Sequence, residues 1–202
     1  CVLELLKYFD NGSKIASKLV QNYFRSNKKI GSKDRKFISN CFWNIIKHSN
    51  KINWHLKNNN FKVTFKRQII LELFFLNIDY KNDFQKIEKI FFLNKNFSKN
   101  FNDDDLLLLK NLNFKNFFNS DMQECVSYEL PDFLLKSIKR NFELDWKNVA
   151  LSLNQEAYVD LRVNTLKNKT RDEIFDLLRK INVPSKISKY SPVGIRLLKR
   201  FP

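Results

Sequence analysis

Apolar residues recur at spacings of three and four from residue 1 to about residue 115. This period places apolar side chains along one face of an α-helix, so we predict that the whole segment is helical. The pattern breaks at 10–13, 29–32, 57–60 and 95–105. Short connections between amphipathic helices predict a compact helical bundle over residues 1–115.

Serines stand at the expected starts of two of these helices. Ser13 precedes apolar positions over 15–24, and Ser32 precedes those over 37–46. A serine at the N-cap accepts a hydrogen bond from a free backbone N–H of the first turn. We therefore predict that both serines cap their helices.

Two further stretches of the helical segment allow more than one interpretation. The apolar run over 69–76 is interrupted by Glu72 and is too short to cross a bilayer, so it predicts a buried helix. Asp103, Asp104 and Asp105 form either a cation site or the start of a helix. Because carboxylates are favourable near a helix N-terminus, we prefer the helix start.

The pattern changes after residue 115. Residues 116–129 are irregular and polar, and we interpret them as a linker. Residues 130–202 predict a small α/β domain that is incomplete at its end. Its expected elements are helices at 131–142, 146–153 and 171–181 and strands at 160–167, 183–190 and 194–200.

Two helices of this domain have recognisable starts. Pro131 suits a first helical position, where its missing N–H would have no partner. Residues 170–173 read Thr-Arg-Asp-Glu, which is typical of a capping box. The apolar faces are predicted to comprise Phe133, Leu134, Ile138 and Phe142 in one helix and Ile174, Leu177, Leu178 and Ile181 in the other.

Residues 160–167 alternate in a way that predicts a half-buried strand. Leu161 and Val163 would lie on one face, and Arg162 and Asn164 on the other. A guanidinium and an amide on an open face can hydrogen-bond phosphates and base edges. Taken alone, these residues are better explained as an ordinary exposed strand face, and the rest of the chain has to decide.

The chain carries a large excess of positive charge. Its 202 residues give a formal net charge of +16 and an isoelectric point near 9.8. Such an excess favours a polyanionic partner such as RNA. The chain is also crowded with Lys, Asn, Phe and Ile, as nucleotide bias would produce, so the charge supports nucleic-acid binding without being specific.

Basic and aromatic residues interleave most densely over 23–36. A helix start preceded by a glycine turn offers free backbone N–H groups to a phosphate. The cations around this turn are Arg25, Lys28, Lys29 and Lys33. The remaining pair, Asp34 and Arg35, either joins this RNA contact or holds the bundle together.

No active site is visible in the sequence. Cys1, Cys41 and Cys125 lie far apart and predict neither a zinc site nor a disulfide framework, so a cytoplasmic location fits best. Cys41 falls on an apolar helix face and is predicted to be a core residue. The three glycines are isolated, which leaves no glycine-rich cofactor turn. No membrane span or signal peptide is visible, and both ends look cut, as expected for a fragment.

Two sets of motifs resemble bacterial Sun/Fmu-type ribosomal RNA (cytosine-5)-methyltransferases. Tyr-Phe-Arg at 23–25, Ile-Gly-Ser-Lys-Asp-Arg at 30–35 and Ile-Asn-Trp at 52–54 resemble their helical N-terminal domain, which is similar to the antitermination factor NusB. Leu-Pro-Asp-Phe-Leu at 130–134 and Leu-Arg-Val-Asn-Thr-Leu-Lys at 161–167 resemble the small α/β domain that precedes their catalytic domain.

The resemblance implies methyl transfer from S-adenosylmethionine to a cytosine of RNA by two cysteines in a Rossmann-like domain, expected after Pro202. Cys1, Cys41 and Cys125 stand outside the family's Pro-Cys and Thr-Cys contexts, and Phe133 replaces a common Trp. We therefore expect this fragment to bind RNA without cofactor, metal or membrane, and to be inactive alone. A stand-alone antitermination-like adaptor and a tRNA methyltransferase are the alternatives. The predicted RNA-binding residues are Arg25, Lys28, Lys29, Lys33, Arg35, Arg162, Asn164 and Lys167.

Overall fold

The computed structural model describes residues 1–11, 15–77, 119–155, 157–167 and 169–199, together with 85, 87, 89, 104, 105, 107 and 108. The described chain is mostly helical and carries one three-stranded sheet near its C-terminal end. It divides into two compact units, Cys1–Ala150 and Leu151–Pro202, which are described separately. The predicted fold class, a helical bundle followed by a small α/β domain, is confirmed.

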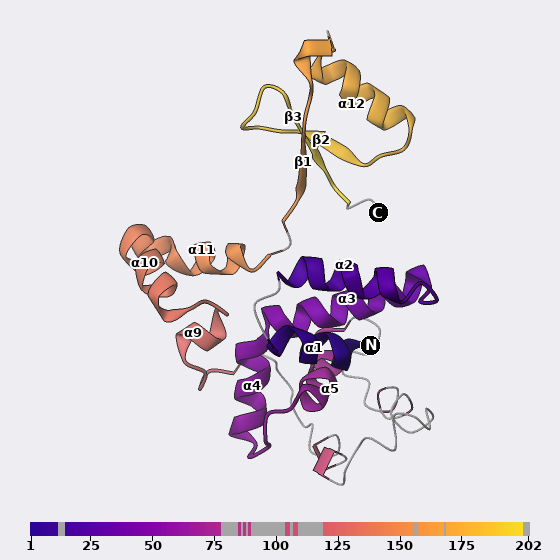
Figure 1. Ribbon diagram of the computed structural model, residues 1–202. Coiled ribbons are helices and arrows are strands. Elements are labelled where there is room, and N and C mark those ends of the chain that lie inside the picture. Colours follow the sequence, from indigo (N-terminus) through magenta and orange to yellow (C-terminus); the bar gives the residue numbers. More distant parts are fainter. Residues whose placement is uncertain are drawn as a thin grey trace. The chain divides into compact units, whose positions relative to one another are not determined.

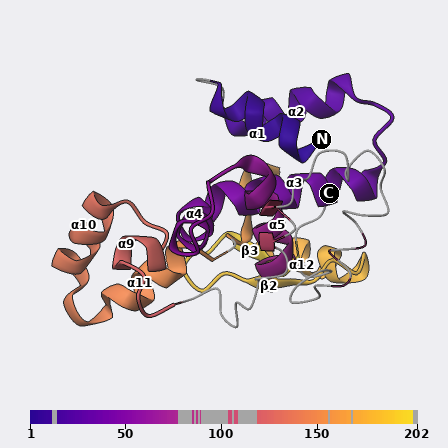
Figure 2. The ribbon, with the colours of Figure 1, turned by 90° about the horizontal axis from the view of Figure 1, so that it is seen from below.

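The helical unit is built around a central helix. Its first helices are α1 (Val2–Asp10), α2 (Ala16–Ser26), α3 (Ser32–Lys47), α4 (Ser49–Asn58) and α5 (Phe65–Phe75). Helices α1, α3 and α4 pack against α5, as Figures 1 and 2 show. Every residue of α5 from Arg67 onward is buried, as expected of a helix that is apolar on nearly all sides. The prediction of a buried helix within 69–76 is confirmed.

Arg67 is a charged residue in this buried helix. Its Nε donates to Asp105 Oδ1 at 2.7 Å, and both side chains are buried. Its Nη1 donates to the carbonyl of Lys62 at 3.0 Å, and Asp104 lies 3.5 Å from Nη2. The acidic residues therefore supply the counter-charge for a core arginine. Asp103 lies outside the described residues, so the predicted helix start there stays a prediction.

The ends of the first helices differ from the predictions by small amounts. Gly31, in extended conformation, occupies the N-cap of α3, and Ser32 is its first helical residue, so the predicted serine cap is wrong by one position. Ser13 lies outside the described residues, and Ile15 stands at the N-cap of α2. The chain also turns at His48, where α3 ends and α4 follows without a loop.

Three further helical segments form a second apolar cluster in this unit. They are α9 (Glu124–Ser127), α10 (Asp132–Phe142) and α11 (Trp146–Leu153), with a 3-10 turn at Glu143–Asp145. The helix predicted over 146–153 is confirmed. Pro131 is the N-cap of α10 and not its first residue, which corrects the prediction. Phe133 is 75% exposed, because Leu135 and Ile138 form the buried face together with Leu130.

The segment before α10 is fixed to the bundle by Glu129. This side chain is 2% exposed, and its Oε1 accepts a hydrogen bond from the backbone N–H of Lys51 at 3.1 Å. Lys51 lies in the first turn of α4, so Glu129 caps that helix from a distant part of the chain. The described part of the proposed linker, 119–129, thus packs on α4. The boundaries at 115 and 130 stay a prediction.

The small unit is a three-stranded antiparallel sheet with one helix. Its elements are β1 (Val159–Arg162), a 3-10 turn (Thr165–Lys167), α12 (Arg171–Lys180), β2 (Ser185–Ile187) and β3 (Gly194–Leu197). The strand order is β1-β3-β2, which places the last strand between the first two (Figure 1). Ile195 and Leu197 of β3 are buried, and α12 packs against β2 and β3. The helix therefore covers the face that carries these two side chains.

The strands are shorter than the alternation predicts. The strand expected over 160–167 ends at Arg162, and Thr165 already begins a 3-10 turn. The strands expected over 183–190 and 194–200 contract to β2 and β3, and Arg200 lies outside the described residues. In the described part of the small unit, the paired register covers these short segments, and single backbone hydrogen bonds such as Val163 N to the Val193 carbonyl extend it slightly.

The predicted capping box at the start of α12 is confirmed. Glu173 N donates to Thr170 Oγ1 at 3.2 Å, and Thr170 N donates to Glu173 Oε2 at 2.8 Å. The predicted apolar face is only partly correct. Leu177 and Ile181 are exposed, because the short sheet covers only the part of the helix that carries Ile174, Phe175 and Leu178.

Candidate nucleic-acid interface

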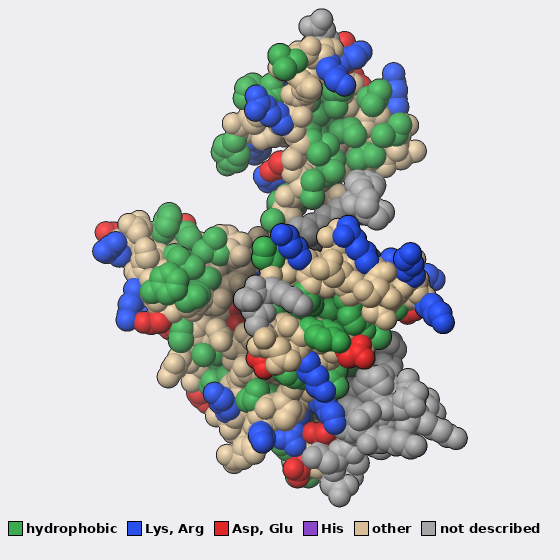
Figure 3. All heavy atoms as spheres, viewed as in Figure 1, with side chains coloured by type: hydrophobic (Ala, Val, Ile, Leu, Met, Phe, Trp, Pro, Cys, Tyr) green, Lys and Arg blue, Asp and Glu red, His purple; other side chains and the backbone are tan. Residues whose placement is uncertain are grey.

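The turn between α2 and α3 displays four of the predicted cations. Arg25 is the penultimate residue of α2, Lys28 and Lys29 lie in the turn, and Lys33 lies in the first turn of α3. All four are exposed. Figure 3 shows Lys and Arg side chains along α2 of the helical unit. Free N–H groups at the start of α3 lie beside these cations, so the turn suits an anionic group.

Arg35 plays a different part in the same turn. Its Nε donates to the carbonyl of Ile30 at 2.8 Å, and its Nη2 donates to the carbonyl of Lys28 at 3.3 Å. Its guanidinium carbon also lies 5.7 Å from the ring centroid of Phe24. The side chain therefore ties α3 to the turn that precedes it. A contact between Arg35 and RNA stays a prediction.

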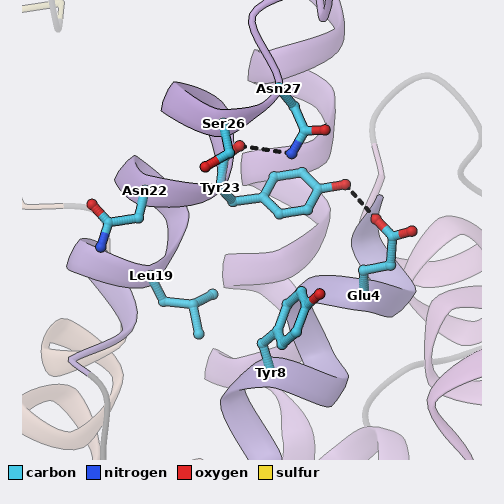
Figure 4. A pocket seen from close by; sticks show the side chains of 7 residues that line it. All are labelled: Glu4, Tyr8, Leu19, Asn22, Tyr23, Ser26 and Asn27. Atoms are coloured by element: carbon cyan, nitrogen blue, oxygen red, sulfur yellow. Dashed lines mark hydrogen bonds between the residues drawn. The ribbon is translucent and has the colours of Figure 1, made fainter.

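A polar pocket of about 400 Å³ lies between α1 and α2. Figure 4 shows Tyr23 of α2 reaching toward Glu4 of α1, and the phenol donates to Glu4 Oε2 at 2.5 Å. Partial burial, and then this hydrogen bond, raise the pKa of Tyr23 well above its usual range. The hydroxyl stays protonated and braces the two helices. The pocket is thus a polar helix contact beside the basic turn.

The three predicted residues near β1 do not share one strand face. Arg162 is the last strand residue and is exposed. Asn164 lies beyond the strand, where its Oδ1 accepts from Leu166 N at 3.1 Å and its carbonyl accepts from Lys167 N at 3.2 Å. The strand predicted to carry both Arg162 and Asn164 therefore ends before Asn164, which leads into the 3-10 turn at Thr165–Lys167. Their contact with RNA stays a prediction.

The sheet instead brings Arg162 together with cations that the sequence analysis did not select. Asp160 pairs with Arg196, and Arg196 pairs with Lys186, so these three residues form one row across the strands. Side chains alternate between the two faces of a sheet, which places this row and Arg162 opposite the face that α12 covers. The alternation of side chains within each strand could have indicated which residues share its open face. Only the pairing register shows that Asp160, Arg196 and Lys186 lie side by side.

Asp160 and Arg196 form a two-pronged ion pair on this open face. Arg196 Nε and Nη2 donate to the two carboxylate oxygens of Asp160 at 2.7 Å each. The hydrogen bonds from Arg196 lower the pKa of Asp160. The pair is exposed, so its main effect is to fix the orientation of the guanidinium.

The structure also places one of the three cysteines, Cys41, in the core. Cys41 is fully buried, and burial followed by the nearby Glu72 raises its pKa, which confirms the predicted core cysteine. Among the described residues, no group of three His, Cys, Asp or Glu side chains could hold a metal ion. None of the described helices is long and apolar enough to span a membrane.

One protein-family model matches the C-terminal part of the chain. Residues 130–202 match the sequence model of the ferredoxin-like domain of RsmF/B-like methyltransferases. This match supports the resemblance to Sun/Fmu-type methyltransferases.

A solved structure has a similar fold. The crystal structure of PH0851 superposes with a TM-score of 0.58 at 14% sequence identity, covering 100% of this chain and 48% of PH0851. At this identity the likeness establishes the fold alone. The chain thus spans about half the length of PH0851. No curated protein matches the sequence.

Proposed function

We propose that this chain is the RNA-binding N-terminal part of a cytoplasmic, S-adenosylmethionine-dependent ribosomal RNA (cytosine-5)-methyltransferase. The observation that carries the proposal is the match of residues 130–202 to a domain of RsmF/B-like methyltransferases. The motifs over 23–35, which resemble the NusB-like domain of the same proteins, support it, with residues 1–115 as that domain. The net charge of +16 supports a polyanionic partner.

The described glycines and the buried Cys41 do not fit a site for S-adenosylmethionine. Gly31 caps a helix in the bundle and Gly194 begins β3, so neither lies in a glycine-rich turn from a strand to a helix. Cys41 is buried and its thiol pKa is raised, which disfavours the nucleophilic thiolate. We therefore assign no methyl-transfer step to these residues. Their proposed role is to hold the RNA.

The cations of the α2–α3 turn would contact the RNA backbone. Arg25, Lys28, Lys29 and Lys33 are exposed and lie beside the N-terminus of α3. Each phosphate contact releases counterions, so each makes the affinity more sensitive to salt. Arg35 would act by shaping the turn, because its guanidinium bonds to two backbone carbonyls there.

The test is RNA binding by the purified chain, measured by fluorescence anisotropy over a range of salt concentrations. We expect Lys33→Ala and Arg162→Ala each to weaken binding and to reduce the slope of log K against log salt by about 0.7–0.9. Lys57→Ala, which removes an exposed lysine near the end of α4, is the matched control and should change neither. If both test variants bind like the wild type at moderate salt, the assigned surface is wrong.

Two further measurements test the substrate and the chemistry. Small-subunit ribosomal RNA transcripts should compete better than tRNA for the labelled RNA, and the reverse order would favour a tRNA substrate. The chain should transfer no methyl group from radiolabelled S-adenosylmethionine. Detectable transfer would contradict the assignment of a binding role alone.

A further inference from the structure

Tyr158 is an exposed aromatic residue at the start of the open sheet face. It precedes β1 by one residue, so alternation places it on the same side as Asp160 and Arg162. Its ring centroid lies 4.8 Å from the guanidinium carbon of Arg196 and 5.8 Å from Nζ of Lys186. The residue nevertheless remains 60% exposed. A large aromatic surface is thus held beside two cations while much of it faces solvent.

Arg196, one neighbour of Tyr158, is held in place before any ligand binds. Arg196 is fixed by its two hydrogen bonds to Asp160, and its guanidinium lies against the tyrosine ring. Arg196 and Lys186 are neighbours across two paired strands. Rigid strands position side chains more exactly than loops do, so little conformational freedom would be lost on binding.

The charge on this face favours a nucleic acid over an apolar partner. Among the paired strand residues that the structure describes, this face carries the cations Arg162, Lys186 and Arg196, and the carboxylate of Asp160 is already paired. Burying these cations against an apolar surface would remove their hydration without compensation. A phosphate chain provides the opposite charges, and its bases provide flat rings for the tyrosine.

We infer that this open face, formed by Tyr158, Arg162, Lys186 and Arg196, binds single-stranded RNA, with Tyr158 stacking against one unpaired base. Lys186 lies beside the tyrosine and would contact the phosphate next to the stacked base. Arg162 lies four residues further along β1, about 13 Å away at 3.3 Å per residue, and would contact a neighbouring nucleotide. The inference rests on the proposed RNA-binding function and names the form of RNA that this face selects.

The experiment compares single-stranded RNA with a duplex of the same composition, using the whole 202-residue chain. Tyr158→Ala should weaken single-strand binding by about 5-fold to 150-fold, the loss typical of one stacked base. Duplex binding should be unchanged, because its bases are already stacked. Tyr158→Phe keeps the ring and should bind like the wild type.

The salt dependence of RNA binding distinguishes base stacking by Tyr158 from phosphate contacts by Lys186. Lys186→Ala should reduce the slope of log K against log salt by about 0.7, whereas Tyr158→Ala should leave the slope unchanged. Lys180→Ala is the matched charge control, because Lys180 lies on α12, which covers the other face of the sheet. Phe133→Ala removes an exposed aromatic residue from the helical unit and controls for the loss of ring area.

Each outcome has a defined meaning. If the chain binds RNA and Tyr158→Ala binds single strands like the wild type, the inference is wrong and the proposed function stands. Equal loss for duplex and single strand, or failure of Tyr158→Phe to restore binding, would also overturn base stacking. Competition by polyglutamate as strong as that by RNA would identify a general anion surface instead. If the wild-type chain binds no RNA, both the inference and the proposed function fail.

Discussion

Two arginines of the helical unit, Arg35 and Arg67, are held differently from two of the small unit, Arg162 and Arg196. Arg67 is buried in an ion pair, and Arg35 bonds to backbone carbonyls of its own turn. In the small unit, Arg162 is exposed, and Arg196 lies on an open sheet face beside Tyr158. The positive charge of the chain therefore has two uses. Part of it stabilises the fold, and only the rest is available to a partner.

The difference follows from the cores of the two units. The helical unit has an extensive core around α5, which is large enough to surround a paired charge. The small unit buries few apolar side chains, chiefly Val163, Ile195 and Leu197. A small domain has little interior to surround charged side chains, which fits the exposure of Arg162 and the open position of the Asp160–Arg196 pair.

The largest expected effect comes from Arg67. Arg67→Ala leaves Asp105 buried without its partner, so the free energy of unfolding should fall by about 3–5 kcal/mol. The measurement is urea denaturation followed by tryptophan fluorescence. All three tryptophans, Trp43, Trp54 and Trp146, lie within Cys1–Ala150, so the signal reports on the helical unit.

Arg25→Ala is the control for this experiment. It removes the same side chain from an exposed position in the same unit, and stability should change by less than about 0.5 kcal/mol. Equal effects of the two substitutions would remove the distinction between structural and displayed arginines.

Arg35 should give the next largest effect. Arg35→Ala removes the guanidinium hydrogen bonds to Ile30 and Lys28, and we expect a loss of about 1–2 kcal/mol because the site is partly exposed. RNA binding should weaken as well, since the turn that carries Lys28 and Lys29 loses its brace. Both are measured on one protein preparation, by urea denaturation and by anisotropy.

Arg35→Lys tests whether Arg35 acts by positioning the α2–α3 turn or by contributing a positive charge to RNA binding. Lysine keeps the charge but lacks the planar fork that bonds to two carbonyls. If Arg35 positions the turn, lysine should restore neither stability nor RNA affinity. Full recovery of RNA affinity by lysine would show that the charge alone matters there.

Much of the fold can be predicted from local sequence, and the errors of that prediction have physical causes. The buried helix α5 and the capping box at Thr170 are determined by nearby residues, so both predictions are confirmed. The break at His48 was missed because the apolar pattern continues through it. The partner of Arg67 lies 38 residues away, and the cap of α4 is supplied by Glu129, so neither is visible in local spacing.

The candidate surfaces depend even more on distant pairing. The exposed cations of the α2–α3 turn are neighbours in sequence and could be selected together. Tyr158, Lys186 and Arg196 are far apart in sequence. They meet on the open sheet face because β1 and β2 both pair with β3 in a defined register. The alternating pattern also selected Asn164, because the pattern continues in the sequence beyond Arg162, where β1 ends.

The capping box gives a smaller effect, within the small unit. Thr170→Ala removes the side chain that accepts from Glu173 N, which should cost about 1 kcal/mol. The measurement is hydrogen exchange of α12 (Arg171–Lys180), read by mass spectrometry. Thr170→Ser keeps the hydroxyl and should retain protection. Loss of protection in α5 as well would show that the two units do not respond separately.

The smallest effect is a difference in how the two units respond to acid. Burial raises the pKa of Glu72 in α5 above its ordinary 4.5, although Asn44 donates to it. The pKa of Glu72 is higher in the folded than in the unfolded state, so the buried carboxylate lowers the free energy of unfolding at neutral pH. Protonation of Glu72 should remove this cost as the pH falls toward 4.5. Hydrogen bonding lowers the pKa of Asp160 and of Glu173 in the small unit. Their contributions are present above the unfolded values and are lost as pH falls through the folded ones.

Mild acidification should therefore raise the urea midpoint of tryptophan fluorescence slightly, whereas stronger acid should reduce hydrogen-exchange protection in α12. Glu72→Gln should flatten the first profile, because the glutamine amide does not titrate in this range. Glu173→Gln should flatten the second for the same reason. If both units lost stability together from neutral pH downward, the opposite signs of these pKa shifts would be contradicted. The contrast between a carboxylate buried in the helical unit and carboxylates exposed on the small unit would then fail as well.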